Sequence, residues 1–228
     1  MRAPGRLLLA LGLALALAPS PSLRGQGPSP TAEAAAATLQ KRYAGVRDFS
    51  TDFVHSYAGG VLRKQLTEKG HLLIKKPGRM RWDYTAPEPK QFVSDGVKLY
   101  SYLPADKQVL VSTVPPDGDA STPAMFLAGK GDVVRDFTPS LVEVPDGMAP
   151  GSLALKLVPR ATQREYEWLI VVLDPQSCRL RGLVTVDGQG GRSTFVFTNL
   201  QENVGTADTQ FAFKMPPGVD VVTDVPRR

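Results

Sequence analysis

The sequence predicts a mainly β protein, in which one helix precedes a sheet of about ten short antiparallel strands. Two observations support this fold class. Apolar and polar residues alternate with a period of two through most of the chain, as in strands with one buried and one wet face. Turn residues recur between the alternating segments, for example at Pro77-Gly78 and Asp95-Gly96. The 228 residues, 42% of them hydrophobic, suffice for one domain with a sizeable core.

The first residues are predicted to be an export signal. Arg2 and Arg6 precede the apolar run Leu7 to Ala18, which ends in small residues. This pattern is typical of a cleavable secretory signal, and the run is too short for a membrane span. We assign residues 1–25 to the signal peptide and its spacer, with the cleavage site left open, and residues 26–228 to a single domain.

The cysteine content separates this chain from lipid-anchored precursors, which carry a cysteine directly after the apolar run. The one cysteine here is Cys178, far from that run. We therefore expect an exported, periplasmic protein that is soluble and not lipid-anchored. One cysteine allows no intramolecular disulfide, so the core must hold the fold and Cys178 is expected to be a structural residue.

The charge balance does not favour a nucleic-acid partner. Three of the 27 basic residues, Arg2, Arg6 and Arg24, lie in the signal and spacer, and the other 24 nearly balance the 22 acidic residues. The sequence has no run of Lys and Arg with interleaved aromatic residues. We expect no nucleic acid, and no more than a weak preference for an acidic partner.

A helix is expected at the start of the domain, and strands follow it. Thr31 is a suitable N-cap, and the Ala-rich stretch after it has high helix propensity. In the first half, strands are expected over Phe49 to Tyr57, Leu72 to Lys76, Met80 to Tyr84 and Val97 to Tyr102. In the second half they are expected over Ser152 to Val158, Tyr166 to Leu173, Leu180 to Asp187, Ser193 to Leu200 and Phe211 to Met215.

A second, short helix is expected between the two halves. Ser121 or Thr122 is placed to cap it, Pro123 suits its first turn, and Gly129 is placed to end it. Its few residues are unusually apolar, because they include Met125, Phe126 and Leu127.

The strand from Met80 to Tyr84 has a large apolar face formed by Met80, Trp82 and Tyr84. A twisted sheet of about ten strands tends to curl, and its concave face must then be filled by side chains, helices or a ligand. The two expected helices offer little cover. These three residues therefore belong either to a plain core or to the wall of a cavity.

No catalytic or metal site is expected. His55 and His71 are the two histidines, and neither has the spacing of a metal-ligand motif. The sequence also lacks a phosphate-binding loop, a dinucleotide fingerprint and a GxSxG nucleophile motif. We expect no enzyme activity, no cofactor and no metal.

Five segments, in this order, resemble the LolA family, the periplasmic carriers of outer-membrane lipoproteins. They are "LQKRYAGVRDFSTDFVH", "GHLLIKKPGRMRWDY", "FVSDGVKLYSYLP", "STPAMFLAGKGD" and "FAFKMPPGV", and the resemblance extends from Leu39 to Asp224. It implies an unclosed antiparallel β-barrel, a half-barrel of about ten or eleven strands with an α-helical lid. The hollow of such a barrel takes the acyl chains of a lipoprotein.

The resemblance also suggests the site residues. We assign the acyl-chain cavity to Phe49, Phe53, Met80, Trp82, Tyr84 and Leu99. We assign the lid and its latch to Leu39, Tyr43, Lys76, Met125, Phe126 and Leu127. Lys76 departs from the arginine that is usual in the family, and a lysine lacks the planar fork with which arginine makes several fixed hydrogen bonds.

The implied partners are acylated lipoproteins, an inner-membrane ABC-type exporter (LolCDE-like) and an outer-membrane acceptor (LolB-like), with the carrier acting as a monomer. Two other functions fit the same scaffold. One is a periplasmic sensor or regulator that controls a membrane partner through lipid binding, and the other is a carrier of glycolipids or other lipids.

The predicted export signal leads to a direct test. We expect the mature protein in the periplasmic soluble fraction, shorter than the full chain by about 18 to 27 residues and without the mass of an attached lipid. Intact-mass spectrometry of fractionated cells measures both. An acylated form, or a form that pellets with membranes, would contradict the prediction.

Overall fold

The computed structural model describes residues 30–59, 64–114 and 122–223. The predicted signal and spacer, residues 1–25, lie outside these ranges, and so does Ser121, one of the two proposed helix caps.

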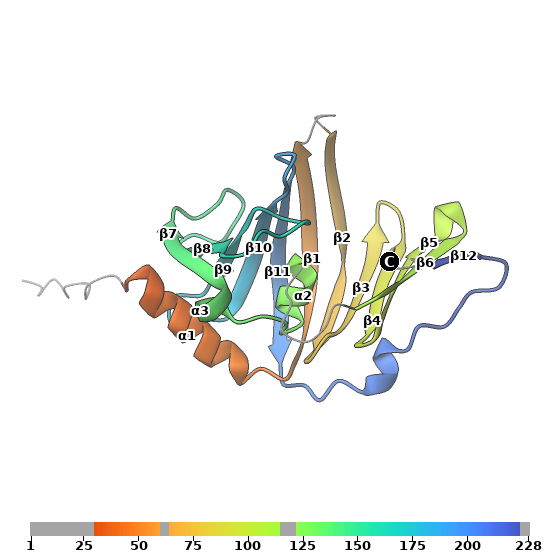
Figure 1. Ribbon diagram of the computed structural model, residues 1–228, viewed down its shortest axis with the longest axis horizontal. Coiled ribbons are helices and arrows are strands. Elements are labelled where there is room, and N and C mark those ends of the chain that lie inside the picture. Colours follow the sequence, from red (N-terminus) through yellow and green to blue (C-terminus); the bar gives the residue numbers. More distant parts are fainter. Residues whose placement is uncertain (1–29, 60–63, 115–121, 224–228) are drawn as a thin grey trace, which may run out of the picture.

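A single curved sheet dominates the described residues, and the helices lie beside it (Figure 1). The helical elements are α1 (Ala32–Ala44), α2 (Pro123–Leu127) and α3 (Val133–Asp136), with 3-10 turns η1 (Pro104–Asp106) and η2 (Asp208–Phe211). The strands are β1 (Asp48–Gly59), β2 (Lys64–Lys75), β3 (Arg79–Ala86), β4 (Lys90–Asp95), β5 (Lys98–Leu103), β6 (Gln108–Thr113), β7 (Phe137–Val142), β8 (Leu153–Pro159), β9 (Trp168–Leu173), β10 (Leu180–Val186), β11 (Arg192–Glu202) and β12 (Asp220–Thr223).

The strand order is β12-β6-β5-β4-β3-β2-β1-β11-β10-β9-β8-β7. Pairing between β1 and β11 joins the two halves of the chain, and the neighbours are antiparallel except β12, which runs parallel to β6. The two ends of the sheet, β7 and β12, do not pair with each other. The predicted unclosed antiparallel barrel is therefore confirmed, with 12 strands in the described ranges instead of ten or eleven.

The central strand β1 shows how the alternating sequence becomes one apolar face. Phe49, Thr51 and Phe53 are buried, while the residues between them are half-buried. Phe53 lies opposite Phe197 of β11 and Gly70 of β2. The inward residues of neighbouring strands therefore form a continuous core on the concave side, and both α1 and α2 contribute to it.

Both predicted helix starts have the expected capping geometry. The Thr31 hydroxyl accepts a hydrogen bond of 3.2 Å from the amide of Ala34, and the Thr122 hydroxyl accepts one of 3.1 Å from the amide of Met125. After α2, Gly129 has a φ of 79°, a conformation that favours glycine.

One predicted strand is absent, and several others begin or end at residues other than the predicted ones. The segment Phe211 to Met215 is not a strand: Phe211 ends η2 and is buried, and the ring of Phe213 stacks on that of Tyr100 in β5, with 4.9 Å between the centroids. Its aromatic side chains are thus anchored without strand pairing. Lys76 lies just beyond β2, because Pro77 follows it and cannot donate to a ladder.

Gly70 makes room for the aromatic rings of the concave face. A Cβ atom at this position would lie 2.6 Å from Cζ of Phe53 and 2.2 Å from the carbonyl oxygen of Asp83. Because the oxygen belongs to the backbone of β3, the clash cannot be relieved by a side-chain movement alone.

We therefore expect Gly70→Ala to lower the free energy of unfolding by about 3 kcal/mol, the upper part of the usual range for overpacking. Gly188→Ala is the matched control, since its Cβ would meet nothing within 4 Å. Urea unfolding of both variants measures the difference. Equal stability of the two variants would contradict this account of Gly70.

Candidate ligand cavity

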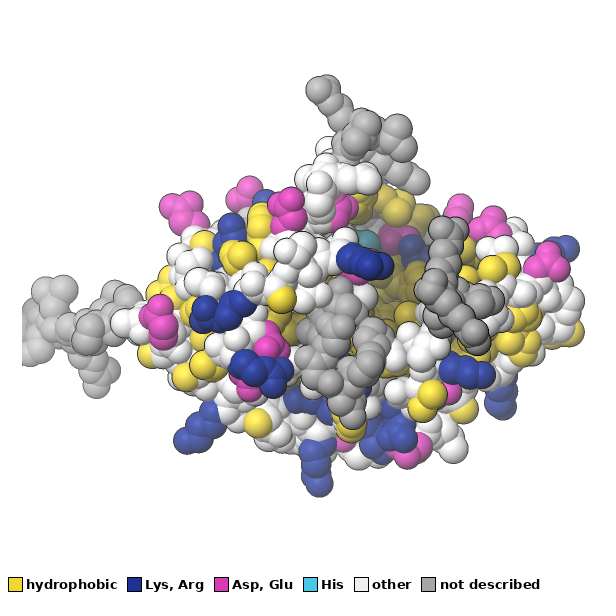
Figure 2. All heavy atoms as spheres, viewed as in Figure 1, with side chains coloured by type: hydrophobic (Ala, Val, Ile, Leu, Met, Phe, Trp, Pro, Cys, Tyr) yellow, Lys and Arg dark blue, Asp and Glu magenta, His cyan; other side chains and the backbone are white. Residues whose placement is uncertain are grey.

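A cavity of about 390 Å³ opens on the concave face of the sheet. Strands β3 to β5 form one wall, β10 and β11 form the other, and the start of α2 closes one side. Figure 2 shows this hollow lined mainly by hydrophobic side chains, with a histidine and charged side chains near its upper edge. The apolar side chains of the strands that line it are Met80, Trp82, Tyr84, Phe92, Leu99, Leu183 and Phe195.

Phe53 lies at the centre of the aromatic cluster behind the cavity wall. Its ring centroid is 5.3 Å from that of Trp82, 4.9 Å from that of Tyr84 and 6.1 Å from that of Phe195, each in an edge-to-face arrangement. Such arrangements are favourable for aromatic pairs. The wall is therefore supported by ring packing from β1, β3 and β11.

The structure divides the six proposed cavity residues into two groups. Met80, Trp82, Tyr84 and Leu99 line the cavity, and Phe53 supports its wall. Phe49 lies at the other end of the concave face, in a narrow pocket that the helices fill.

Sequence reasoning did not select Phe92, Leu183 and Phe195 of the lining. For Phe195 a signal was available, because Ser193, Phe195 and Phe197 alternate along one face of an expected strand. Its place opposite His55 depends on the register between β11 and β1, which no local pattern specifies.

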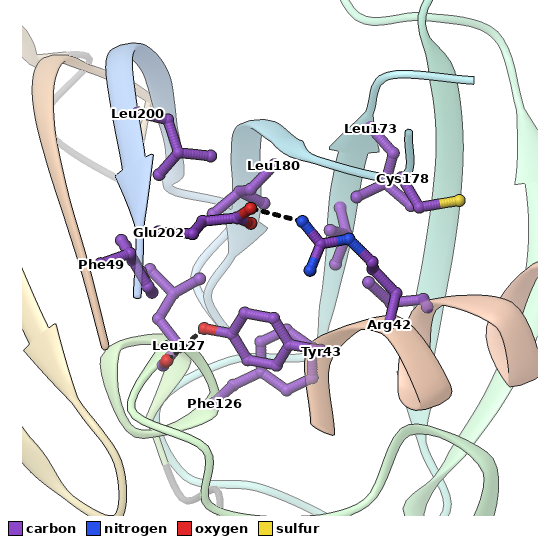
Figure 3. Close-up of a pocket in the computed structure, with 12 residues that line it drawn as sticks. Arg42, Tyr43, Phe49, Phe126, Leu127, Leu173, Cys178, Leu180, Leu200 and Glu202 are labelled. Atoms are coloured by element: carbon purple, nitrogen blue, oxygen red, sulfur yellow. Dashed lines mark hydrogen bonds and ion pairs between the residues drawn. The ribbon is translucent and has the colours of Figure 1, made fainter. Parts of the chain in front are cut away.

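The proposed lid residues fill the other end of the concave face as a helix plug, by which we mean Leu39 and Tyr43 of α1 with Met125, Phe126 and Leu127 of α2. Leu39, Met125, Phe126 and Leu127 are at most 6% exposed. In Figure 3, Tyr43, Phe126 and Leu127 lie together below Phe49. The plug thus covers one end of the apolar concave face, and the cavity lies where the face is not covered.

A chain of polar contacts, the Lys76 latch, links the sheet to both helices of the plug. The Lys76 ammonium donates to the carbonyl of Tyr43 and lies 3.5 Å from the centroid of its ring. The Tyr43 hydroxyl in turn donates to the carbonyl of Leu127 (Figure 3). Lys76 therefore contacts α1 directly and reaches α2 through Tyr43.

Burial governs the ionisation of both latch residues. It lowers the pKa of Lys76 from 10.5 to about 8, although the carboxylate of Glu202 acts in the opposite direction. It also raises the pKa of Tyr43 above its ordinary value, so that this hydroxyl stays protonated and able to donate.

A second attachment of α1 went unpredicted. Arg42 pairs with Glu202 at the end of β11 (Figure 3). It also donates to the carbonyl of Ser177 at 3.3 Å. Arg179 lies 3.4 Å from the same carboxylate. No sequence signal could have shown the pairing of Arg42 with Glu202. A basic residue in the last turn of a helix is usually solvated, and the two residues are 160 positions apart.

Polar side chains replace apolar ones at the far end of the aromatic cluster. His55 stacks on Phe195 at 4.1 Å, and its Nδ1 lies 3.1 Å from a carboxylate oxygen of Glu68. Lys90 donates to the other oxygen of Glu68 at 2.6 Å and lies 4.4 Å from the ring of Tyr84. Burial lowers the pKa of His55, and the nearby Glu68 offsets this in part.

A Ser-His-Asp arrangement occurs away from the cavity. Ser50 Oγ lies 3.0 Å from Nε2 of His71, whose Nδ1 lies 2.7 Å from Asp52. The order matches that of a nucleophile, its base and an orienting acid. None of the three lines the cavity, and the side chains of His71 and Asp52 are 42% and 50% exposed.

Among the described residues, none of the helices is long and apolar enough to cross a membrane. No cluster of three or more His, Cys, Asp or Glu side chains among those residues could hold a metal ion.

Comparison with known proteins identifies the family. The model of the outer membrane lipoprotein carrier protein LolA matches residues 44–214. The chain belongs to the LolA family. The resemblance of the five sequence segments is thereby confirmed.

Curated relatives of this LolA-family chain carry the name outer-membrane lipoprotein carrier protein. The one from Methylobacillus flagellatus is 35% identical over 156 residues, which are 68% of this chain and 72% of the relative. The one from Chromohalobacter salexigens is 30% identical over 180 residues, 78% of this chain and 82% of the relative.

An uncharacterized conserved protein from Thermus thermophilus has the same fold, with a TM-score of 0.50, 13% identity and coverage of 83% of this chain and 99% of that one.

The lowered pKa of Lys76 predicts how stability depends on pH. Its pKa is 10.5 in the unfolded chain and about 8 in the folded one, so between these values the unfolded chain binds more protons. The cost of burying the charge is present in full below about pH 8 and is relieved toward pH 10.5, so stability rises with pH in this window.

We therefore expect the wild type to gain stability relative to Lys76→Met between about pH 7.5 and pH 10, because methionine does not ionise. Urea unfolding at both pH values measures the gain. Lys98→Met, at an exposed position of β5, is the control and should show a smaller change. A difference between wild type and Lys76→Met that is independent of pH would refute the burial of this ammonium.

Proposed function

We propose that this protein is a periplasmic carrier of lipoproteins, in which the domain of residues 26–228 shields the acyl chains between the two membranes. The observation that carries the proposal is the junction of an apolar cavity with a plug made of the chain's own helices. Family membership and the name of the curated relatives support the same function.

The energetics of transfer explain why a carrier needs such a plug. Burial of one long acyl chain contributes on the order of 10 kcal/mol, at about 0.8 kcal/mol per methylene. A carrier that gained all of this energy would release its cargo very slowly. If the chain must displace apolar side chains of α1 and α2, one apolar filling replaces another and most of the gain is offset.

The size of the cavity favours such a displacement. Its 390 Å³ is near the lower end of the range of about 300 to 1,000 Å³ that is typical for ligand pockets. A lipid anchor with more than one chain therefore requires further space, and the helix plug occupies the adjoining part of the concave face. Opening the Lys76 latch would release that space.

The proposed partners follow from the family. The carrier would take lipoproteins from an inner-membrane ABC-type exporter of the LolCDE kind and pass them, as a monomer, to an outer-membrane acceptor of the LolB kind. The transfer involves no covalent step, so no catalytic residue is assigned. The curated relatives are named as carriers, which favours transport over a sensor or regulator.

A charge placed in the cavity wall tests the proposal. Leu99 is half-buried and lines the cavity. We expect Leu99→Glu to fold but to bind acyl lipids and membrane-released lipoproteins at least about tenfold more weakly, because the chain would have to desolvate a carboxylate. The measurement is the removal of a purified lipoprotein from inner-membrane vesicles by each variant, beside a thermal melt.

Val97→Glu is the matched control for this test. Val97 lies two positions earlier, is 67% exposed and does not line the cavity. It should carry lipoproteins as the wild type does. Equal transfer by the two variants, both folded, would place the acyl chains elsewhere and refute the proposed site.

A further inference from the structure

The wall that β10 and β11 form changes from apolar to polar along the cavity. Leu183, Thr185 and Asp187 follow one another along β10 and the turn after it, and all three line the cavity. Ser193 of β11 pairs with Thr185 and lines the cavity beside it. The wall therefore runs from a hydrocarbon side chain, through two hydroxyls, to a carboxylate.

The hydroxyl of Thr185 has no hydrogen-bond partner in the described part of the chain, although the residue is only 8% exposed. Its oxygen stays open to the cavity, whereas Nε1 of Trp82, which also has no partner there, is sealed off. A ligand that displaces water from such a group has to replace the hydrogen bonds of that water, or it binds weakly. The Thr185 hydroxyl therefore favours a polar group on the ligand.

Two carboxylates lie at the same end of the cavity. Oδ1 of Asp187 accepts hydrogen bonds from the amides of Gln189 and Gly191 at 2.9 Å and 2.8 Å, and its Oδ2 has no partner in the described ranges. Glu165 is exposed and also lines the cavity. The amide of Glu167 donates to the carbonyl of Val186 at 2.8 Å, which places the segment that carries Glu165 beside the β10–β11 turn.

The charge at this end of the cavity is negative. None of the described residues that line the cavity is basic. Lys90 lies 4.4 Å from the ring of Tyr84, but it pairs with Glu68 at 2.6 Å. Arg164 is exposed and does not line the cavity. The carboxylates of Glu165 and Asp187 therefore determine the sign of the charge that a head group meets here.

We propose that this polar end of the cavity binds a primary ammonium group that the cargo carries next to its acyl chains, as in a lipidated residue with a free α-amino group. This inference rests on the proposed carrier function and specifies the head group. An ammonium has three N–H donors and a positive charge, so it can donate to the Thr185 hydroxyl and to the carboxylates. An N-acylated head lacks the charge, and an anionic head is repelled.

Three amphiphiles with the same alkyl chain provide the test. Decylammonium has charge and N–H donors, decyltrimethylammonium has the charge alone, and decanoate has the opposite charge. Isothermal titration of the purified mature protein at pH 7, below the micellar concentrations, gives three dissociation constants. We expect decylammonium to bind at least about fivefold more tightly than decanoate, and the preference to shrink as salt is added.

Neutral variants of the two acids separate charge from packing. The double variant Glu165→Gln with Asp187→Asn should lose most of the preference for decylammonium over decanoate. Asparagine keeps an oxygen for the two turn amides, so the turn should persist. Glu167→Gln is the control, because Glu167 is exposed and does not line the cavity, and it should keep the wild-type preference.

A second variant tests the hydroxyl. Thr185→Val keeps the shape of the side chain and should weaken decylammonium by about threefold or more, while decyltrimethylammonium, which has no N–H, binds as before. Thr194→Val is its control, since Thr194 is half-buried and does not line the cavity. Equal effects of Thr185→Val on the two cations would overturn the role of this hydroxyl.

The outcomes distinguish this inference from the proposed function. If the wild type binds these amphiphiles with the same preference as the double variant, the ammonium site is wrong and the carrier function stands. If the wild type binds none of the three, the proposed acyl cavity fails and the ammonium site fails with it. Should the double variant not fold, each single variant is expected to lose part of the preference, and an undiminished preference in both overturns the inference.

Discussion

The rest of the structure depends on one constraint, which is that the apolar concave face of an unclosed sheet has to be covered. A closed barrel would cover this face with its own opposite wall, but here β7 and β12 remain apart at the two ends of the sheet. In the described ranges the helices α1 and α2 supply cover, and they fill one end of the face. The cavity lies where this cover ends, between Trp82 and Leu183.

Besides the apolar packing of the plug, polar contacts attach the cover to the sheet. Lys76 and Tyr43 connect β2, α1 and α2, and Arg42 pairs with Glu202 at the end of β11. A partly desolvated ammonium contributes less to stability than an apolar contact of similar size, because its burial has a cost. The strands of the sheet, by contrast, are joined by continuous backbone ladders, so the displacement of the plug that we propose would leave the pairing of the strands in place.

The concave face also changes in character along its length. The plug end is apolar, the middle is aromatic around Phe53, and the far end carries the Glu68 and Lys90 pair beside His55. An amphiphilic ligand would be oriented by this gradient, since its alkyl part gains from burial while its head keeps polar partners. The gradient gives a physical reason why the proposed cargo enters in one direction.

The sequence alone determined the elements whose cause is local. Period-two alternation specified β1 and β3, and the caps Thr31 and Thr122 specified where α1 and α2 begin, because side-chain spacing and capping act over a few residues. The five family segments likewise indicated the half-barrel and most of the residues proposed for the cavity and the lid.

Only the tertiary structure decided which of these residues meet. The pairing of β1 with β11 brings Phe195 onto His55, and the fold brings Arg42 to Glu202 across 160 positions. It also turned Phe211 to Met215 into an anchored loop and separated Phe49 from the cavity that Met80 and Trp82 line. Strand register and helix docking depend on how much apolar surface the whole concave face buries. That burial involves residues that are far apart in the sequence, so no local stretch of sequence specifies it.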